Sequence, residues 1–140
     1  MDNMRRAANA YKRAQVDATV LGASPHELIA ILLAKAIEST NEAKRHMESG
    51  DIERKGQAIK LAIAIISDGL RGSLNLQEGG EIAANLNMLY EYMTEKLLQA
   101  HAENNAAMLD EVVALLGDIK AGWDGIKPQH ATSPQLQPQA

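Results

Sequence analysis

The chain has 140 residues, a formal net charge of −4 and no cysteine. This length predicts one domain that buries its own hydrophobic core. The lack of cysteine excludes disulfides, thiolate metal sites and cysteine nucleophiles. The mild negative charge argues against a general nucleic-acid binder, and no segment reaches the roughly 20 apolar residues of a membrane-spanning helix. We therefore expect a soluble protein of the cytosol that does not bind nucleic acid and does not insert into a membrane.

The apolar residues are mainly Ala, Leu, Ile and Met, with one tryptophan and no phenylalanine. Apart from Ile, these are strong helix formers, so the composition favours an all-α protein. Along the chain, the first predicted element is a short helix over residues 4–20. Its amphipathic pattern is weak, and Gly22 separates it from the elements that follow.

Clear start and stop signals bound the second predicted helix. Ser24 is suited to be its N-cap, with Pro25 in the first turn and Glu27 completing a capping box. Gly50 ends this helix, and Asp51 can cap the third. The third helix carries an apolar stripe at helical spacing, which predicts a buried face. Its residues are Ile52, Ile59, Ile63, Ile66, Leu70 and Leu74.

The fourth predicted helix runs from about residue 81 to 102, after a loop over residues 76–80. Asn104 or Asn105 caps the last helix, whose apolar stripe ends at Trp123 or Ile126. In the fourth helix, apolar residues recur at steps of four, three and four, so we expect them to face the core. These residues are Ile82, Leu86, Leu89 and Met93.

Short connections between long helices make consecutive helices antiparallel neighbours. The sequence therefore predicts an all-α, antiparallel up-down four-helix bundle over residues 24–126, with an additional short N-terminal helix over residues 1–22. Together they form a single domain, residues 1–126. Residues 127–140 are rich in Pro and Gln, so we expect a flexible tail there.

A search for catalytic or metal-binding patterns finds none. Di-iron bundles need Glu-x-x-His motifs, and the zinc-protease pattern that His26 and Glu27 would open has Ala30 in place of its second ligand. We expect His26 on the surface, and His46 and His101 exposed near helix ends. The sequence thus predicts a protein without enzymatic activity, metal or cofactor.

The second and third helices carry more apolar residues than one buried face uses. Two interpretations stay open: a wide bundle core, or a groove for an apolar partner segment. The additional residues are Ile29 or Ile31, Leu33, Ile65 and Leu70.

Residues 79–93 closely resemble the flagellin-specific export chaperones of the FliS family. Residues 23–29 are similar to the start of that family's second helix, and residues 62–74 to its third. Tyr11 and Trp123 match aromatic positions near the two ends of the family's domain. One departure lies at residues 32–37, where the family often has Leu-Tyr-Asp-Gly-Ala-Ile and this chain has Leu-Leu-Ala-Lys-Ala-Ile.

The resemblance implies a cytosolic chaperone that binds the disordered C-terminal segment of flagellin, in a 1:1 complex, without a cofactor. Capping that segment would prevent premature polymerisation and keep flagellin competent for the flagellar export gate, a second candidate partner. The third candidate partner is a second copy of the same chain, in a weak homodimer of the free protein. The alternative from another class is a helical phosphorelay or adaptor bundle that binds a folded partner. We expect the first helix to cover part of the binding groove and to move when the client binds. The predicted contact residues are Tyr11, Val16, Val20, Leu33, Ile63, Ile66, Leu70 and Tyr90.

Overall fold

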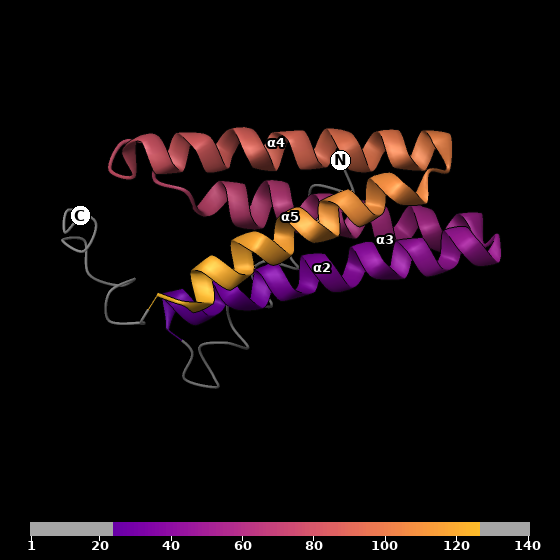
Figure 1. Cartoon of the computed structure of the whole chain (residues 1–140), viewed down its shortest axis with the longest axis horizontal. Coiled ribbons are helices and arrows are strands. Elements are labelled where there is room, and N and C mark those ends of the chain that lie inside the picture. Colours follow the sequence, from indigo (N-terminus) through magenta and orange to yellow (C-terminus); the bar gives the residue numbers. More distant parts are fainter. Residues whose placement is uncertain (1–23, 127–140) are drawn as a thin grey trace.

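The computed structural model describes residues 24–126, and this part of the chain is a bundle of helices without a strand (Figure 1). The predicted all-α four-helix bundle is thereby confirmed. The helix expected over residues 4–20 and the tail expected over residues 127–140 lie outside the described residues. The elements are the α-helices α2 (Pro25–Ser49), α3 (Ile52–Ala64), α4 (Gly80–Glu103) and α5 (Ala106–Asp124), the π-helical turn η1 (Ile65–Leu70) and the 3-10 turn η2 (Arg71–Ser73).

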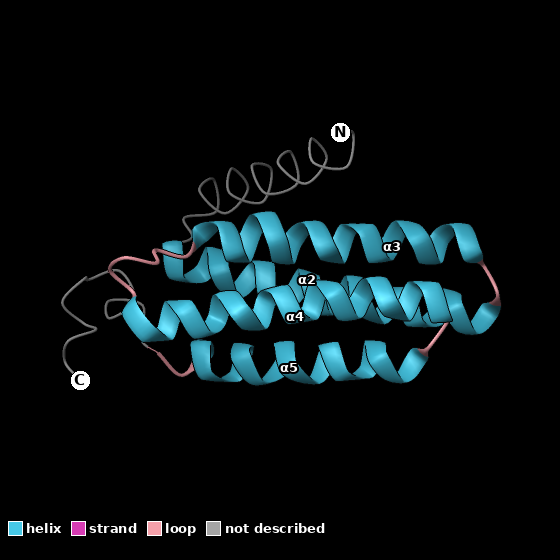
Figure 2. Ribbon diagram, turned by 90° about the horizontal axis from the view of Figure 1, so that it is seen from above, coloured by secondary structure: helices cyan, strands magenta, loops and turns pink. Residues whose placement is uncertain are grey.

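The four helices are antiparallel and surround one core. In the two views, α2 and α4 lie diagonally opposite, with α3 and α5 between them (Figures 1 and 2). The connections from α2 to α3 and from α4 to α5 lie at one end of the bundle, which we name the turn end. The connection from η2 to α4 lies at the other, the pocket end (Figure 2). The largest fully buried side chains include Leu32, Leu33, Ile59, Ile66, Leu70, Met93, Leu97, Leu109, Val112 and Leu116.

The predicted cap of α2 is confirmed. The Ser24 hydroxyl accepts a hydrogen bond from the backbone N–H of Glu27 at 3.2 Å, and the Ser24 N–H donates to the Glu27 carboxylate at 2.7 Å. At the other end of α2, Gly50 has φ +80°, a left-handed conformation that suits glycine. Asp51 accepts from the backbone N–H of Arg54 at 3.1 Å and so caps α3 as expected.

The connection from α4 to α5 is equally tight. Asn104 has φ +56°, and Asn105 caps α5 by accepting from the backbone N–H of Ala107 at 3.0 Å. Lys55 of α3 is buried beside this turn and donates to the carbonyl of His101 at 3.2 Å and to Asn104 Oδ1 at 2.6 Å. It therefore satisfies acceptors at the C-terminus of α4, where a positive charge is favourable.

The third helix differs from the prediction because it is not a continuous α-helix. After Ala64 the chain forms the π-helical turn η1 and then the 3-10 turn η2. Apolar spacing could not reveal this, because an α-turn and a π-turn both place Ile66 and Leu70 on the same side. Of the predicted core stripe, Ile59, Ile66 and Leu70 are buried, and Ile63 and Leu74 are partly buried against the core.

Two isoleucines predicted to lie in the core are exposed instead. Ile52 is 69% exposed and Ile82 is 74% exposed. Both lie in the first turn of their helices and on the side that faces solvent, so no neighbouring helix covers them. The rest of the stripe on α4 behaves as expected, since Met93 is buried and Leu86 and Leu89 pack against the core.

Candidate functional site

An apolar pocket of about 120 Å³ opens at the pocket end of the bundle. Residues of α2, α4, α5 and the turns η1 and η2 line it, because the starts of α2 and α4, the end of α5 and the turns that follow α3 meet here. An apolar cavity of about 150 Å³ takes up benzene, so a pocket of this size can accept one large apolar side chain. The lining residues are Ile29, Leu33, Leu70, Ser73, Leu74, Leu86, Tyr90, Ile119 and Trp123.

A reciprocal pair of side chains ties α2 to α5 at this pocket. Nε1–H of Trp123 donates to the carbonyl of His26 at 2.9 Å, and Nε2–H of His26 donates to the carbonyl of Trp123 at 2.9 Å. The two rings are stacked, with centroids 4.9 Å apart and an angle of 11° between their planes. The pair fixes the position of the indole that lines the pocket.

This pair corrects the prediction for His26, which is only 6% exposed rather than a surface residue. The prediction was wrong because a first-turn histidine normally faces solvent, and local sequence does not show that the end of α5 packs over it. Nδ1 of His26 is buried without a hydrogen-bond partner among residues 24–126.

The pocket also has two hydroxyl-bearing lining residues. Ser73 donates its hydroxyl proton to the carbonyl of Leu70 at 2.8 Å, so this proton is already used within the chain. Tyr90 is 3% exposed, and burial raises the pKa of its phenol to about 12. Tyr90 is therefore neutral at physiological pH, and the pocket carries no charge on its lining residues.

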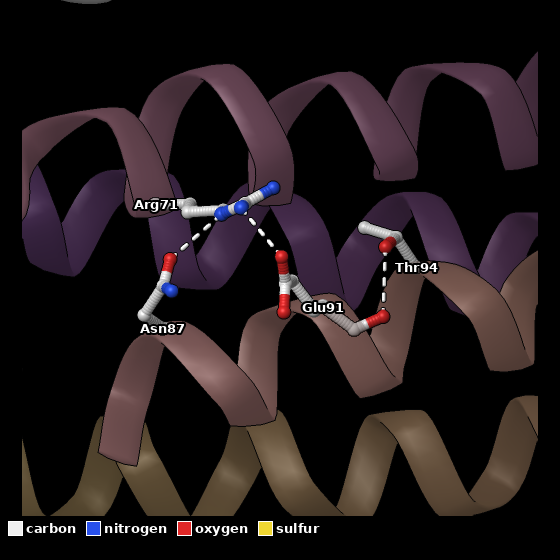
Figure 3. A network of polar contacts seen from close by, with 4 residues as sticks. All are labelled: Arg71, Asn87, Glu91 and Thr94. Atoms are coloured by element: carbon white, nitrogen blue, oxygen red, sulfur yellow. Dashed lines mark hydrogen bonds and ion pairs between the residues drawn. The ribbon is translucent and has the colours of Figure 1, made fainter. Parts of the chain in front are cut away.

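A polar network joins η2 to α4 (Figure 3). Nε–H of Arg71 donates to Asn87 Oδ1 at 2.7 Å, and Nη2–H donates to Glu91 Oε2 at 2.5 Å. Asn87 and Glu91 are one turn apart on the same face of α4. The Thr94 hydroxyl donates to the carbonyl of Glu91 at 2.9 Å.

The structure brings three of the predicted contact residues together at the pocket: Leu33, Leu70 and Tyr90. Ile66 is fully buried in the core, and Ile63 is partly buried against it. For Leu33, Ile65 and Leu70, burial supports the interpretation of a wide core. Tyr11, Val16 and Val20 lie outside the described residues. The role of all eight in partner binding stays a prediction.

Sequence reasoning did not group the other lining residues into a site. Leu86 was predicted to face the core and Trp123 was a candidate for it, and both pack against it, as does Ile119. The usable signal was topological: in an antiparallel bundle, the start of one helix meets the end of the next. Apolar residues near alternate helix ends could therefore have been grouped.

The other features of the site surroundings give no metal or membrane signal. Within residues 24–126, no group of three or more His, Asp or Glu side chains could hold a metal ion. At the turn end, His101 is partly buried and not exposed as predicted. Burial lowers the pKa of its imidazole, and the positive charges of Lys55 and Lys60 lower it further. No helix in the described range is both long and apolar enough to span a bilayer.

Comparison with known proteins identifies the class of this bundle. The family model described as "Flagellar protein FliS" matches residues 7–130. The chain therefore belongs to the FliS family, as the resemblance of residues 79–93 predicted.

Individual relatives match along nearly their whole length. The chain is 39% identical to the flagellar secretion chaperone FliS of Vibrio cholerae, over 91% of this chain and 93% of the relative. It is 42% identical to the protein of the same name from Salmonella typhimurium, over 86% and 89%. It is 44% identical to the flagellar secretion chaperone FliSB of Pseudomonas aeruginosa, over 86% and 95%.

Proposed function

We propose that this protein is a cytosolic flagellar export chaperone that binds the disordered C-terminal region of flagellin. In this role it forms a 1:1 complex, prevents premature polymerisation of flagellin and keeps it competent for the flagellar export gate. The observation that carries the proposal is the family match together with relatives named flagellar secretion chaperones, which align over most of both chains. This activity requires neither catalysis nor a cofactor. We favour it over the alternative of a phosphorelay or adaptor bundle because the relatives are named secretion chaperones.

The pocket supports this role through simple energetics. Ordering a disordered segment on binding costs roughly 2–5 kcal/mol of the gross interaction energy. Burying one Leu, Ile, Phe or Met side chain contributes about 1.5–3 kcal/mol. The end pocket accepts one such side chain, so it offsets a large part of the ordering cost but does not by itself give tight binding.

Further anchor positions are therefore needed along the bundle. Three large apolar side chains are exposed on α3 and α4 and could serve: Leu61, Met88 and Leu98. The predicted contacts Leu33, Leu70 and Tyr90 would form the wall of the end pocket around the first anchor. A chain of separate, modest anchors suits a chaperone, because the client must also leave.

Co-expression with flagellin from the same bacterium tests the proposal. We expect a soluble complex, and light scattering should give the mass of one chaperone plus one flagellin. Flagellin that lacks its C-terminal segment should not be recovered, whereas flagellin that lacks its N-terminal segment should be. Failure of full-length flagellin to bind would contradict the proposal. Sedimentation of the free protein decides separately whether it dimerises.

A further inference from the structure

We propose that Arg71 is a positioning residue that sets the width of the end pocket, and thereby the affinity for the client. Its guanidinium joins the two pocket walls that no helix cap holds in place. The binding part of this inference rests on the proposed function. The structural part, the effect of Arg71 on the pocket, concerns the free protein and can be measured without a client.

The position of the network relative to the pocket is the first observation. Each of its three pocket-end residues directly follows a residue that lines the pocket, so the network runs along the rim. The three pairs are Leu70–Arg71, Leu86–Asn87 and Tyr90–Glu91. A change in the distance between Arg71 and α4 therefore changes the distance between the pocket's apolar walls.

The irregular backbone of these walls is the second observation. One wall is formed by η1 and η2, and π-helical and 3-10 turns have poorer hydrogen-bond geometry than an α-helix. The opposite wall is the start of α4, where Gly79 provides no side-chain cap. Both walls lack the local restraints that Ser24, Asp51 and Asn105 give to the other helix starts.

The geometry of the guanidinium is the third observation. Arg71 uses Nε–H and Nη2–H, which lie on one edge of the planar group, to reach acceptors one helical turn apart (Figure 3). Such a fork fixes both distance and orientation, whereas a lysine ammonium is a point charge without a planar fork. Among the described residues, the other side-chain tie between the third helix and α4 is Lys55, at the opposite end.

Three variants test the inference. Arg71→Met keeps the aliphatic stem and removes the fork, and Arg71→Lys restores the charge alone. Arg54→Met is the matched control, because Arg54 makes a long contact of 3.7 Å to Asp51 at the turn end and is well exposed. Circular dichroism and thermal melting first establish that each variant is folded.

Two readouts distinguish positioning from general stability. Trp123 is the only tryptophan of the chain and lines the pocket, so acrylamide quenching of its fluorescence reports on the free pocket. We expect faster quenching for Arg71→Met than for the wild type. Calorimetry with the flagellin C-terminal segment should give a dissociation constant roughly threefold to fivefold weaker, as expected for a partly exposed charged contact. Arg71→Lys should recover only part of both effects.

The inference is overturned if Arg71→Met melts at a lower temperature but keeps wild-type quenching and affinity. It is also overturned if Arg54→Met loses as much affinity as Arg71→Met. If wild-type protein does not bind flagellin at all, the proposed function fails, and the quenching comparison still decides the structural role of Arg71.

Discussion

The chain reverses direction in different ways at the two ends of the bundle. At the turn end, two short connections reverse the chain through left-handed residues, Gly50 and Asn104, and capping side chains follow at once. The buried Lys55 satisfies the last carbonyl groups of α4. At the pocket end, the third helix passes through a π-turn and a 3-10 turn, and a longer connection over residues 74–79 leads to α4.

The difference shows where this fold leaves room for a partner. A pocket of about 120 Å³ opens at the irregular end. Mutations at the turn end should therefore change stability alone. Mutations at the pocket end should also change client binding.

The largest expected effect compares two buried leucines, one at each end. Leu109 lies in the first turn of α5 at the turn end, and Leu70 lines the pocket; both are almost fully buried. Truncation of a buried leucine to alanine costs about 2–5 kcal/mol of unfolding free energy, measured by urea denaturation. We expect this loss in Leu109→Ala and Leu70→Ala, and weaker flagellin binding in Leu70→Ala only. Equal binding by the two folded variants would remove the distinction between the ends.

A second prediction concerns the lysine at the turn end. Lys55→Ala leaves the Asn104 side chain and the His101 carbonyl without their charged donor. We expect a loss of about 2 kcal/mol in unfolding free energy, since hydrogen bonds to charged groups contribute about 1.5–3 kcal/mol. Client affinity should not change. Lys60→Ala is the matched control, because Lys60 is exposed on the same helix and should have little effect.

Filling the pocket should weaken client binding while leaving stability nearly unchanged, which is the reverse of the effect expected for Lys55→Ala. Leu86→Phe places a larger side chain into the existing space, so the overpacking cost of about 1–3 kcal/mol in a close-packed core should be largely avoided. We expect client affinity to fall about tenfold, the loss of roughly 1.4 kcal/mol from one blocked anchor. Ile52→Phe, at an exposed position of α3 at the turn end, should bind normally. Calorimetry that finds the two variants equal would show that the pocket takes no anchor.

The smallest effect is a pH dependence at the turn end. Burial, and then Lys55 and Lys60, lower the pKa of His101 below its ordinary value of 6.5. The unfolded chain therefore binds a proton more readily than the folded one, and stability falls as the pH drops below about 6.5. His101→Gln should reduce this dependence. Urea denaturation at pH 7.5 and at pH 5.5 measures it, and an unchanged slope in the variant would assign the dependence to other groups.

The helix boundaries were predictable because their signals are local. Ser24 and Glu27, Gly50 and Asp51, and Asn105 each act within one helical turn, so the sequence alone carries their geometry. The family also followed from short runs of sequence, above all residues 79–93, and the match over residues 7–130 confirmed it.

The features that were missed depend on neighbours distant in sequence. His26 is buried by Trp123, and the exposure of Ile52 and Ile82 depends on where adjacent helices end. The pocket requires residues from α2, α4, α5 and the turns that follow α3, and periodicity treats a pocket-lining leucine and a core leucine alike. The π-turn at Ile65–Leu70 was missed for a different reason, because apolar spacing does not distinguish it from an α-turn.

The reciprocal pair of His26 and Trp123 also bears on the order of folding during synthesis. These residues are 97 positions apart and belong to the first and last helices of the described bundle. A ribosome that has made α2, α3 and α4 has therefore not yet made the partner that closes the ring of helices. Until α5 emerges, Ile29 and Leu33 lack the cover that Ile119 and Trp123 provide. A chaperone of this design thus exposes its own apolar surface on the nascent chain and becomes ready for a client only when its last helical turn has been translated.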